Sequence, residues 1–143
     1  MKILRYNLDM LNESLMSEIR NALKPEPKII AAYVLGSYVF GKETGESDFD
    51  LAVVVESRKD ISFDHIYNLL SEIKFPKDLD LSVVDRSSSP LFLFQAINGR
   101  CAYARSGEDR GLFEASIAEN YYDTAHMRKI YYSHLKEKFP YAG

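Results

Sequence analysis

The chain has 143 residues, of which 46% are hydrophobic and 27% are charged, and its net charge is −3. This size and composition suit one globular domain, and we expect a single domain over residues 1–143. The acidic balance argues against a protein that binds nucleic acid directly by coating its phosphates. It leaves a nucleotide substrate open, because a metal ion supplies positive charge.

Cellular location is constrained by two absences in the sequence. There is no N-terminal signal pattern, and no apolar run is long enough to span a membrane. Cys101 is the only cysteine, which excludes an internal disulfide. We therefore expect a reduced, cytoplasmic protein that has no membrane partner.

The first half of the chain reads as a helix followed by two buried strands. Apolar residues from Leu8 to Leu23 recur at helical spacing, and two prolines end that helix. Residues 29–35 are apolar throughout, which predicts a strand buried on both faces. A loop that contains Gly45 follows, and residues 49–56 predict a second buried strand.

The second half of the chain alternates helices with short strands. Ser62 is the predicted N-cap of a helix over residues 63–73, and residues 79–84 predict a third strand. A short helix after Pro90 should stop at Asn98 and Gly99, before a strand at 100–105. Residues 112–139 predict one long C-terminal helix. The alternation predicts an α/β fold with a small mixed sheet flanked by helices.

Two aspartates open the second strand. Asp48 and Asp50 point to the same side because alternate side chains share a face, whereas Phe49 points into the core. Their Cα atoms should lie roughly 6.5 to 7 Å apart. Carboxylates at that spacing suit a pair of divalent cations, and hard oxygen ligands favour Mg²⁺. We therefore predict two magnesium ions bound here.

Two other features complete the predicted site. Asp80 is flanked by leucines in the third strand, and it faces the first two aspartates if the second and third strands are neighbours. Gly36 and Ser37 follow the first strand, where glycine lets a backbone approach a ligand closely. If Ser37 opens a short helix, backbone N–H groups and the hydroxyl form an anion site. Phosphates held there would be set for in-line attack.

Gly-Ser, ten intervening residues, Asp-x-Asp and a later strand aspartate together resemble the nucleotidyltransferase superfamily typified by DNA polymerase β. Most of the chain is similar to the minimal nucleotidyltransferases (MNT proteins), the antitoxins of HEPN/MNT toxin–antitoxin pairs. The resemblance implies the polymerase β-like palm fold. It also implies that Asp48, Asp50 and Asp80 are catalytic and bind metal, with Asp80 drawing the proton from the attacking hydroxyl.

The same resemblance implies that Gly36 and Ser37 hold ATP, and that AMP is transferred to a tyrosine of a HEPN RNase toxin, which silences the toxin. Asp78 lies on the same strand face as Asp80 and is the alternative third carboxylate. A homodimer or a complex with the toxin is the expected assembly. The alternatives are an aminoglycoside-type enzyme acting on a small molecule, and an antitoxin that acts by binding alone.

The remaining candidate residues have simpler interpretations. His65, His126 and His134 lack metal-ligand spacing, so surface positions are expected. Cys101 should be a small buried residue of a short strand. Among the pairs Tyr121–Tyr122 and Tyr131–Tyr132, the helical spacing of Tyr121, Tyr122 and Tyr132 predicts core or interface packing. The alternative is that the pairs form a toxin-docking surface.

Overall fold

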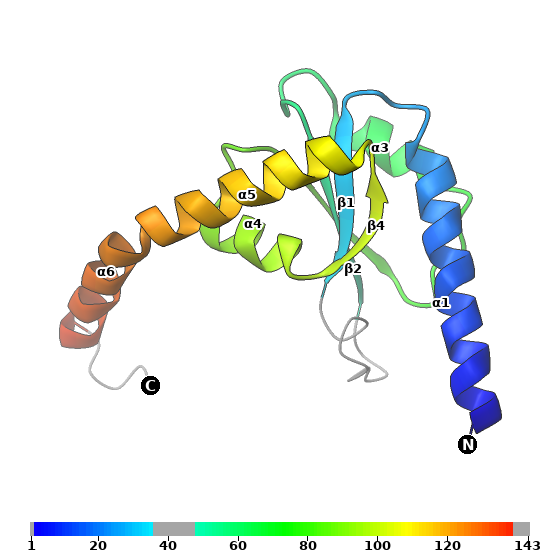
Figure 1. The fold of residues 1–143 in the computed structure, drawn as a ribbon, viewed down its shortest axis with the longest axis horizontal. Helices are drawn as coiled ribbons and strands as arrows, with labels where there is room; N and C mark the ends of the chain where they lie inside the picture. Colours follow the sequence, from blue (N-terminus) through cyan, green and yellow to red (C-terminus); the bar gives the residue numbers. More distant parts are fainter. Residues whose placement is uncertain (1, 36–47, 139–143) are drawn as a thin grey trace.

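The computed structural model describes residues 2–35 and 48–138 (Figure 1). In this part of the chain one sheet contains the strands β1 (Ile29–Leu35), β2 (Phe49–Val55), β3 (Leu79–Val84) and β4 (Arg100–Ala104). The strand order is β3-β2-β1-β4. β1 is antiparallel to β2 and β4, whereas β2 and β3 are parallel. The predicted mixed sheet is confirmed.

Helices cover both faces of this sheet. They are α1 (Lys2–Leu23), α3 (Phe63–Leu69), α4 (Pro90–Ile97), α5 (Gly107–Asp123) and α6 (Ala125–Lys138). Buried residues of α1 and α3 pack with one face of β1 and β2, and those of α4 and α5 pack with the other. Figure 1 shows α6 extending away from the sheet beyond α5. None of the described helices is long and apolar enough to cross a membrane.

The central strands form because their apolar runs fill both faces. Every residue of β1 except Leu35 is buried, and every residue of β2 except Asp50. Continuous apolar runs of this length are typical of strands covered by helices on both sides. The predicted burial of both strands is confirmed, and Asp50 is the one polar interruption of β2.

Serine caps fix three helix starts. The Ser62 side chain accepts a hydrogen bond from the His65 N–H at 3.1 Å, which confirms the predicted N-cap. Ser89 precedes Pro90 and caps α4, and the Ser106 hydroxyl accepts from the Asp109 N–H at 3.0 Å to cap α5. Each cap satisfies a backbone donor that has no partner inside its helix.

The end of α4 also follows the prediction. Asn98 is its C-cap, and Gly99 turns the chain into β4. A Cβ atom on Gly99 would lie 2.5 Å from the backbone oxygen of Val34, so the close approach of this turn to β1 requires glycine.

The extents of two helices were predicted wrongly. The expected single helix over 112–139 begins earlier, at Gly107, and is interrupted at Thr124, whose hydroxyl donates to the Asn120 carbonyl at 2.9 Å. The helix expected to run to Ile73 ends at Leu69, and the Ser71 hydroxyl donates to the Asn68 carbonyl at 2.7 Å. Hydroxyl groups that bond to nearby carbonyls compete with helical pairing, which apolar periodicity does not reveal.

Candidate active site at one end of the sheet

Asp50 and Asp80 face each other across two neighbouring strands. β2 and β3 run parallel, and Asp50 is the direct register partner of Asp80. Both lie near the start of their strands, so both carboxylates are at the same end of the sheet. Asp50 is half-buried and Asp80 is exposed. The condition attached to Asp80 in the sequence, that its strand neighbours the second strand, is met.

Alternation along β2 directs the acidic side chains to one face. Phe49 is 1% exposed, belongs to the core beneath α1 and α3, and its ring centroid lies 5.1 Å from that of Phe75. Asp50 therefore points to the opposite face, where Val54 and Val84 are buried further along the strands. Asp48 precedes the strand and is exposed. Phe49 thus anchors the strand while the acids stay accessible.

The environment of Asp50 disfavours its negative charge. Partial burial raises its pKa, and a hydrogen bond with Asp80 and repulsion from Asp80 and Asp48 raise it further. Like-charged carboxylates that share a site cannot all ionise freely without a compensating cation. This end of the sheet therefore has a local excess of negative charge.

Asp78, the alternative third carboxylate, is placed differently. Its side chain is exposed, and its backbone carbonyl accepts a hydrogen bond from the Phe49 N–H at 2.8 Å. The register pairs Asp80, and not Asp78, with Asp50. The geometry therefore favours Asp80 as the acid that works with Asp50.

Gly36 and Ser37 lie outside the described residues. The residue before them, Leu35, is the register partner of Asp50 on the other neighbouring strand. β1 therefore ends beside Asp50, which is where the predicted phosphate-binding residues would have to begin.

The donor chemistry of this end fits a hard divalent cation. Within residues 2–35 and 48–138, no three acidic, histidine or cysteine side chains are gathered closely enough to form a metal site. Asp48, Asp50 and Asp80 nevertheless offer only carboxylate oxygens, the ligands that Mg²⁺ prefers. A cation between them would relieve the repulsion that raises the pKa of Asp50.

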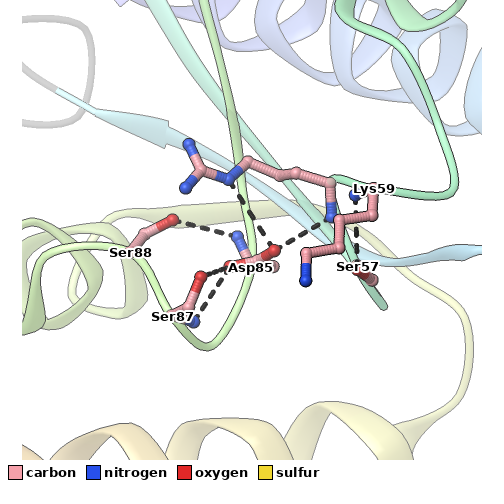
Figure 2. A network of polar contacts seen from close by, with 6 residues as sticks. Ser57, Lys59, Asp85, Ser87 and Ser88 are labelled. Carbon is pink, nitrogen blue, oxygen red and sulfur yellow. Dashed lines mark hydrogen bonds and ion pairs between the residues drawn. The ribbon is translucent and has the colours of Figure 1, made fainter.

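A different carboxylate lies at the opposite end of the same strands. Asp85 follows β3 directly and is 8% exposed. Its oxygens accept hydrogen bonds from the Arg58 N–H at 2.9 Å and the Ser87 N–H at 2.9 Å, and from the Ser87 hydroxyl. Figure 2 shows Ser87 and Ser88 on one side of Asp85, with Ser57 and Lys59 on the other. Asp85 therefore joins the segments that follow the two parallel strands.

These donors stabilise the charged form of Asp85. The Ser87 hydroxyl contributes most, followed by the Arg58 N–H, and together with the Ser87 N–H they lower the pKa of Asp85 to about 2. Sequence reasoning did not select this residue, because an aspartate between a strand and a serine-rich segment also describes an ordinary surface loop. We assign it a structural role, since the bond from the Arg58 N–H joins the segment after β2 to the segment after β3, and the two bonds from Ser87 hold the turn that follows β3.

The other sequence candidates take surface or packing positions. His65 contacts the Glu26 carboxylate at 3.0 Å, and His126 and His134 are exposed, as expected. Cys101 is only half-buried, and its thiol donates to the Tyr103 carbonyl at 3.3 Å. None of these residues lies with the carboxylates in the register of β2 and β3.

The four paired tyrosines differ from one another. Tyr121 stacks on Phe94 with ring centroids 3.9 Å apart, which confirms packing for that residue. Tyr122, Tyr131 and Tyr132 are exposed by 67%, 61% and 49%. Core packing is therefore wrong for Tyr132, because α6 extends away from the sheet. It is also wrong for Tyr122 at the end of α5, although that ring contacts Phe94 edge-on.

Solved structures share the fold of this chain. One described as a toxin–antitoxin with AMP-PNP is 22% identical with a TM-score of 0.62, covering 84% of this chain and 97% of that one. Another, described as the tri-AMPylated HEPN toxin of Shewanella oneidensis in complex with MNT antitoxin, is 20% identical with a TM-score of 0.56, covering 88% and 97%. A third, also from Shewanella oneidensis, is 20% identical with a TM-score of 0.55, covering 94% of each chain. No curated protein matches the sequence significantly.

Family comparison matches residues 17–108 to the family described as polymerase beta, nucleotidyltransferase. The match spans the end of α1, the whole sheet and the start of α5, and it includes Asp48, Asp50 and Asp80. The chain therefore belongs to the polymerase beta nucleotidyltransferase family.

Proposed function

We propose that this protein is a Mg²⁺-dependent nucleotidyltransferase that transfers AMP from ATP to a tyrosine hydroxyl of a HEPN-type toxin, and so acts as an antitoxin. One observation carries the proposal: Asp50 and Asp80 are opposed in register on parallel strands, with Asp48 two residues before Asp50. Family membership supports the general reaction class.

Each carboxylate has a distinct task in this reaction. Asp48 and Asp50 would hold two magnesium ions together with Asp80, and the ions would neutralise charge on the phosphates and on the departing pyrophosphate. Asp80 accepts the proton of the attacking hydroxyl. The tyrosine oxygen forms a bond to the α-phosphorus, the bond from that phosphorus to the bridging oxygen breaks, and pyrophosphate leaves with the bonding electrons.

Nucleotide positioning falls to the residues after β1 in this proposal. Gly36 and Ser37 would bind the triphosphate through backbone N–H groups and the serine hydroxyl. The support is the pairing of Leu35 with Asp50, which brings the end of β1 beside the carboxylates.

The choice of acceptor is supported by structures of similar fold. One relative is described as an MNT antitoxin in complex with a tri-AMPylated toxin, and another as a complex with AMP-PNP. Asp80 is exposed and Asp50 is half-buried, so the reacting groups are accessible to a side chain of another protein. A protein hydroxyl is therefore a reasonable acceptor for this small domain.

Transfer of label from ATP tests the proposal. The purified chain is incubated with Mg²⁺, ATP labelled at the α-phosphate and the product of the neighbouring gene, which the proposal expects to be a HEPN-type protein. The expected result is label on a tyrosine of that protein, with loss of its RNase activity. Asp48→Ala/Asp50→Ala is the inactive comparison, and Asp85→Asn is the control for a carboxylate outside the site.

Other outcomes distinguish the rival functions. An unlabelled toxin that is still neutralised by both the wild type and Asp48→Ala/Asp50→Ala would falsify transfer and leave an antitoxin that acts by binding. Label on an aminoglycoside in a screen of hydroxyl acceptors, with none on the toxin, would indicate a small-molecule enzyme. Label that requires no Mg²⁺ would contradict the assigned role of the carboxylates.

A further inference from the structure

Helix α6 has few contacts within its own chain. Of its described side chains, only Ala125, Arg128 and Leu135 are partly buried. Met127 is 67% exposed and Tyr131 is 61% exposed. Isolated helices shorter than about 12 to 15 residues are marginal in water, and most helices are stabilised by packing an apolar face. We therefore expect the exposed aromatic and aliphatic side chains of α6 to pack against another molecule.

The end of α5 and one side of α6 form a groove. The groove has a volume of about 490 Å³, and its walls include Tyr121, Tyr122, Arg128, Lys129, Tyr132 and Lys136. Tyr121 stacks on Phe94 of α4, and the Arg128 guanidinium lies 3.7 Å from the centre of the Tyr121 ring. Arg128 also donates to the Tyr121 carbonyl at 2.7 Å. These contacts fix the groove to the body of the protein.

The groove carries positive charge in an acidic protein. Lys129 and Lys136 are exposed, and among the described residues neither has an acid within ion-pair distance. They are seven residues apart, which places them on one face about 10.5 Å from each other along the helix. The two lysines can pair with carboxylates of a folded partner protein, and the aromatic rings beside them can pack against its apolar groups.

Charge elsewhere on the molecule favours an acidic protein over nucleic acid. The whole chain has a net charge of −3, and Asp48, Asp50, Asp78 and Asp80 gather at the start of β2 and β3. A nucleic acid that extended from the groove over the rest of the protein would be repelled by these carboxylates. A protein whose acidic residues are confined to the part that contacts the groove would be repelled less.

The direction of α6 relates the groove to the carboxylates. In Figure 1, α6 turns down from α5 at the side of the molecule away from the sheet, and it ends at the level where β1 finishes and β2 begins. We propose that the α5–α6 groove and the exposed face of α6 dock an acidic surface of the acceptor protein and hold its tyrosine beside Asp50 and Asp80. This inference rests on the proposed function, because the docked partner is the acceptor of that reaction.

Charge reversal on the groove tests the inference. Binding of the HEPN-type protein to the full chain is measured by calorimetry without ATP, for the wild type, Lys129→Glu/Lys136→Glu and Lys24→Glu/Lys59→Glu. The control variant reverses the charge of two exposed lysines that lie away from α6, so its net charge equals that of the groove variant. We expect the groove variant to bind at least about 10-fold more weakly, with a reduced dependence on salt, and the control to change less than about 2-fold.

A kinetic readout and a milder variant separate docking from folding. Raised KM for the acceptor with unchanged kcat is expected for Lys129→Glu/Lys136→Glu. Lys129→Gln/Lys136→Gln, which removes charge without reversing it, should give an intermediate KM. Circular dichroism checks that both variants keep the helix content of the wild type. Unchanged affinity in the reversed variant would overturn the inference.

Other occupants of the groove give different results. A single-stranded oligoribonucleotide that binds the wild type and not the groove variant, with acceptor binding unaffected, would overturn the inference in favour of nucleic acid. A dimer of the chain alone that dissociates in the groove variant, again with acceptor binding unaffected, would overturn it in favour of self-association. Acceptor binding that depends on Lys129 and Lys136 while the wild type transfers no label would refute the proposed function and retain the docking surface.

Discussion

Asp80 and Asp85 stand at opposite ends of strand β3 and meet opposite environments. Asp80 is exposed and faces Asp50, whose pKa is raised by burial and by neighbouring carboxylates. Asp85 is buried, and the donors around it lower its pKa to about 2. The fold supplies every partner that Asp85 needs and leaves the carboxylates of Asp50 and Asp80 repelling each other. This difference supports our proposal that the first end binds a ligand and that the second is a structural junction.

Replacing the exposed acid should give the largest effect on activity. We expect Asp80→Asn to lower the rate of AMP transfer by about 10²- to 10⁴-fold, the range typical of a lost general base. The free energy of unfolding should change by less than about 0.5 kcal/mol, because an exposed acid near like charges contributes little to stability. Labelled-ATP transfer and urea denaturation measure the two quantities. A loss of stability without a loss of transfer would reverse the assignment.

The buried acid should show the converse behaviour. Asp85→Ala leaves the Arg58 N–H and the Ser87 N–H without their acceptor. Both hydrogen bonds are only partly buried, so water can replace part of each. We therefore expect the free energy of unfolding to fall by about 1–2 kcal/mol in urea denaturation, the lower part of the range for an unsatisfied donor. Transfer measured well below the melting temperature should stay within about 3-fold of the wild type. A larger loss of transfer in a folded variant would mean that the two ends are coupled.

The pH dependence of the unfolding free energy tests the structural role of Asp85. The pKa of Asp85 is about 2 in the folded chain, below its ordinary value of 3.8, so its contribution is present above that value and is lost as the pH falls toward 2. A shift of this size corresponds to at most about 2.5 kcal/mol. Asp85→Asn should remove this part of the acid sensitivity. The check is the difference in unfolding free energy between wild type and variant at a series of pH values, and a constant difference would contradict the assignment.

The smallest predicted effect concerns Tyr33, a residue of β1 that lies between the two ends of the sheet. Tyr33 is fully buried in β1, and its hydroxyl donates to Glu114 of α5 at 2.9 Å. Burial, together with this carboxylate, raises its pKa. We expect Tyr33→Phe to cost about 0.5–1.5 kcal/mol of unfolding free energy. Arg110 still pairs with Glu114 at 3.0 Å, which limits the loss. A cost above that of Asp85→Ala in thermal or urea unfolding would contradict this ranking.

Much of the fold could be predicted from two strand patterns, a continuous apolar run in residues 29–35 and alternation of apolar and polar residues in 79–84. Residues 29–35 and 79–84 were predicted as strands with the bounds that the structure has. The opposite directions of Phe49 and Asp50 follow from alternation along a strand, whereas Asp48 lies just before β2, so its predicted direction stays a prediction. The choice between Asp78 and Asp80 needed the register of β2 with β3, which depends on contacts between distant segments.

Tertiary contacts also explain what sequence patterns missed. The spacing of Tyr121, Tyr132 and Leu135 predicted one buried helical face, but the interruption at Thr124 takes α6 away from the sheet. Burial of Asp85 depends on donors from two segments that meet only when β2 and β3 pair. Neither feature is visible in local periodicity.

One assay tests the central claim most directly. The wild type, Asp50→Ala/Asp80→Ala and Asp85→Asn are each incubated with Mg²⁺, ATP labelled at the α-phosphate and the HEPN-type protein, and the initial rate of label transfer is measured. The account predicts that the first variant is folded and loses at least about 10³-fold in rate. It predicts that Asp85→Asn transfers at close to the wild-type rate. Equal rates for the wild type and Asp50→Ala/Asp80→Ala would contradict the account.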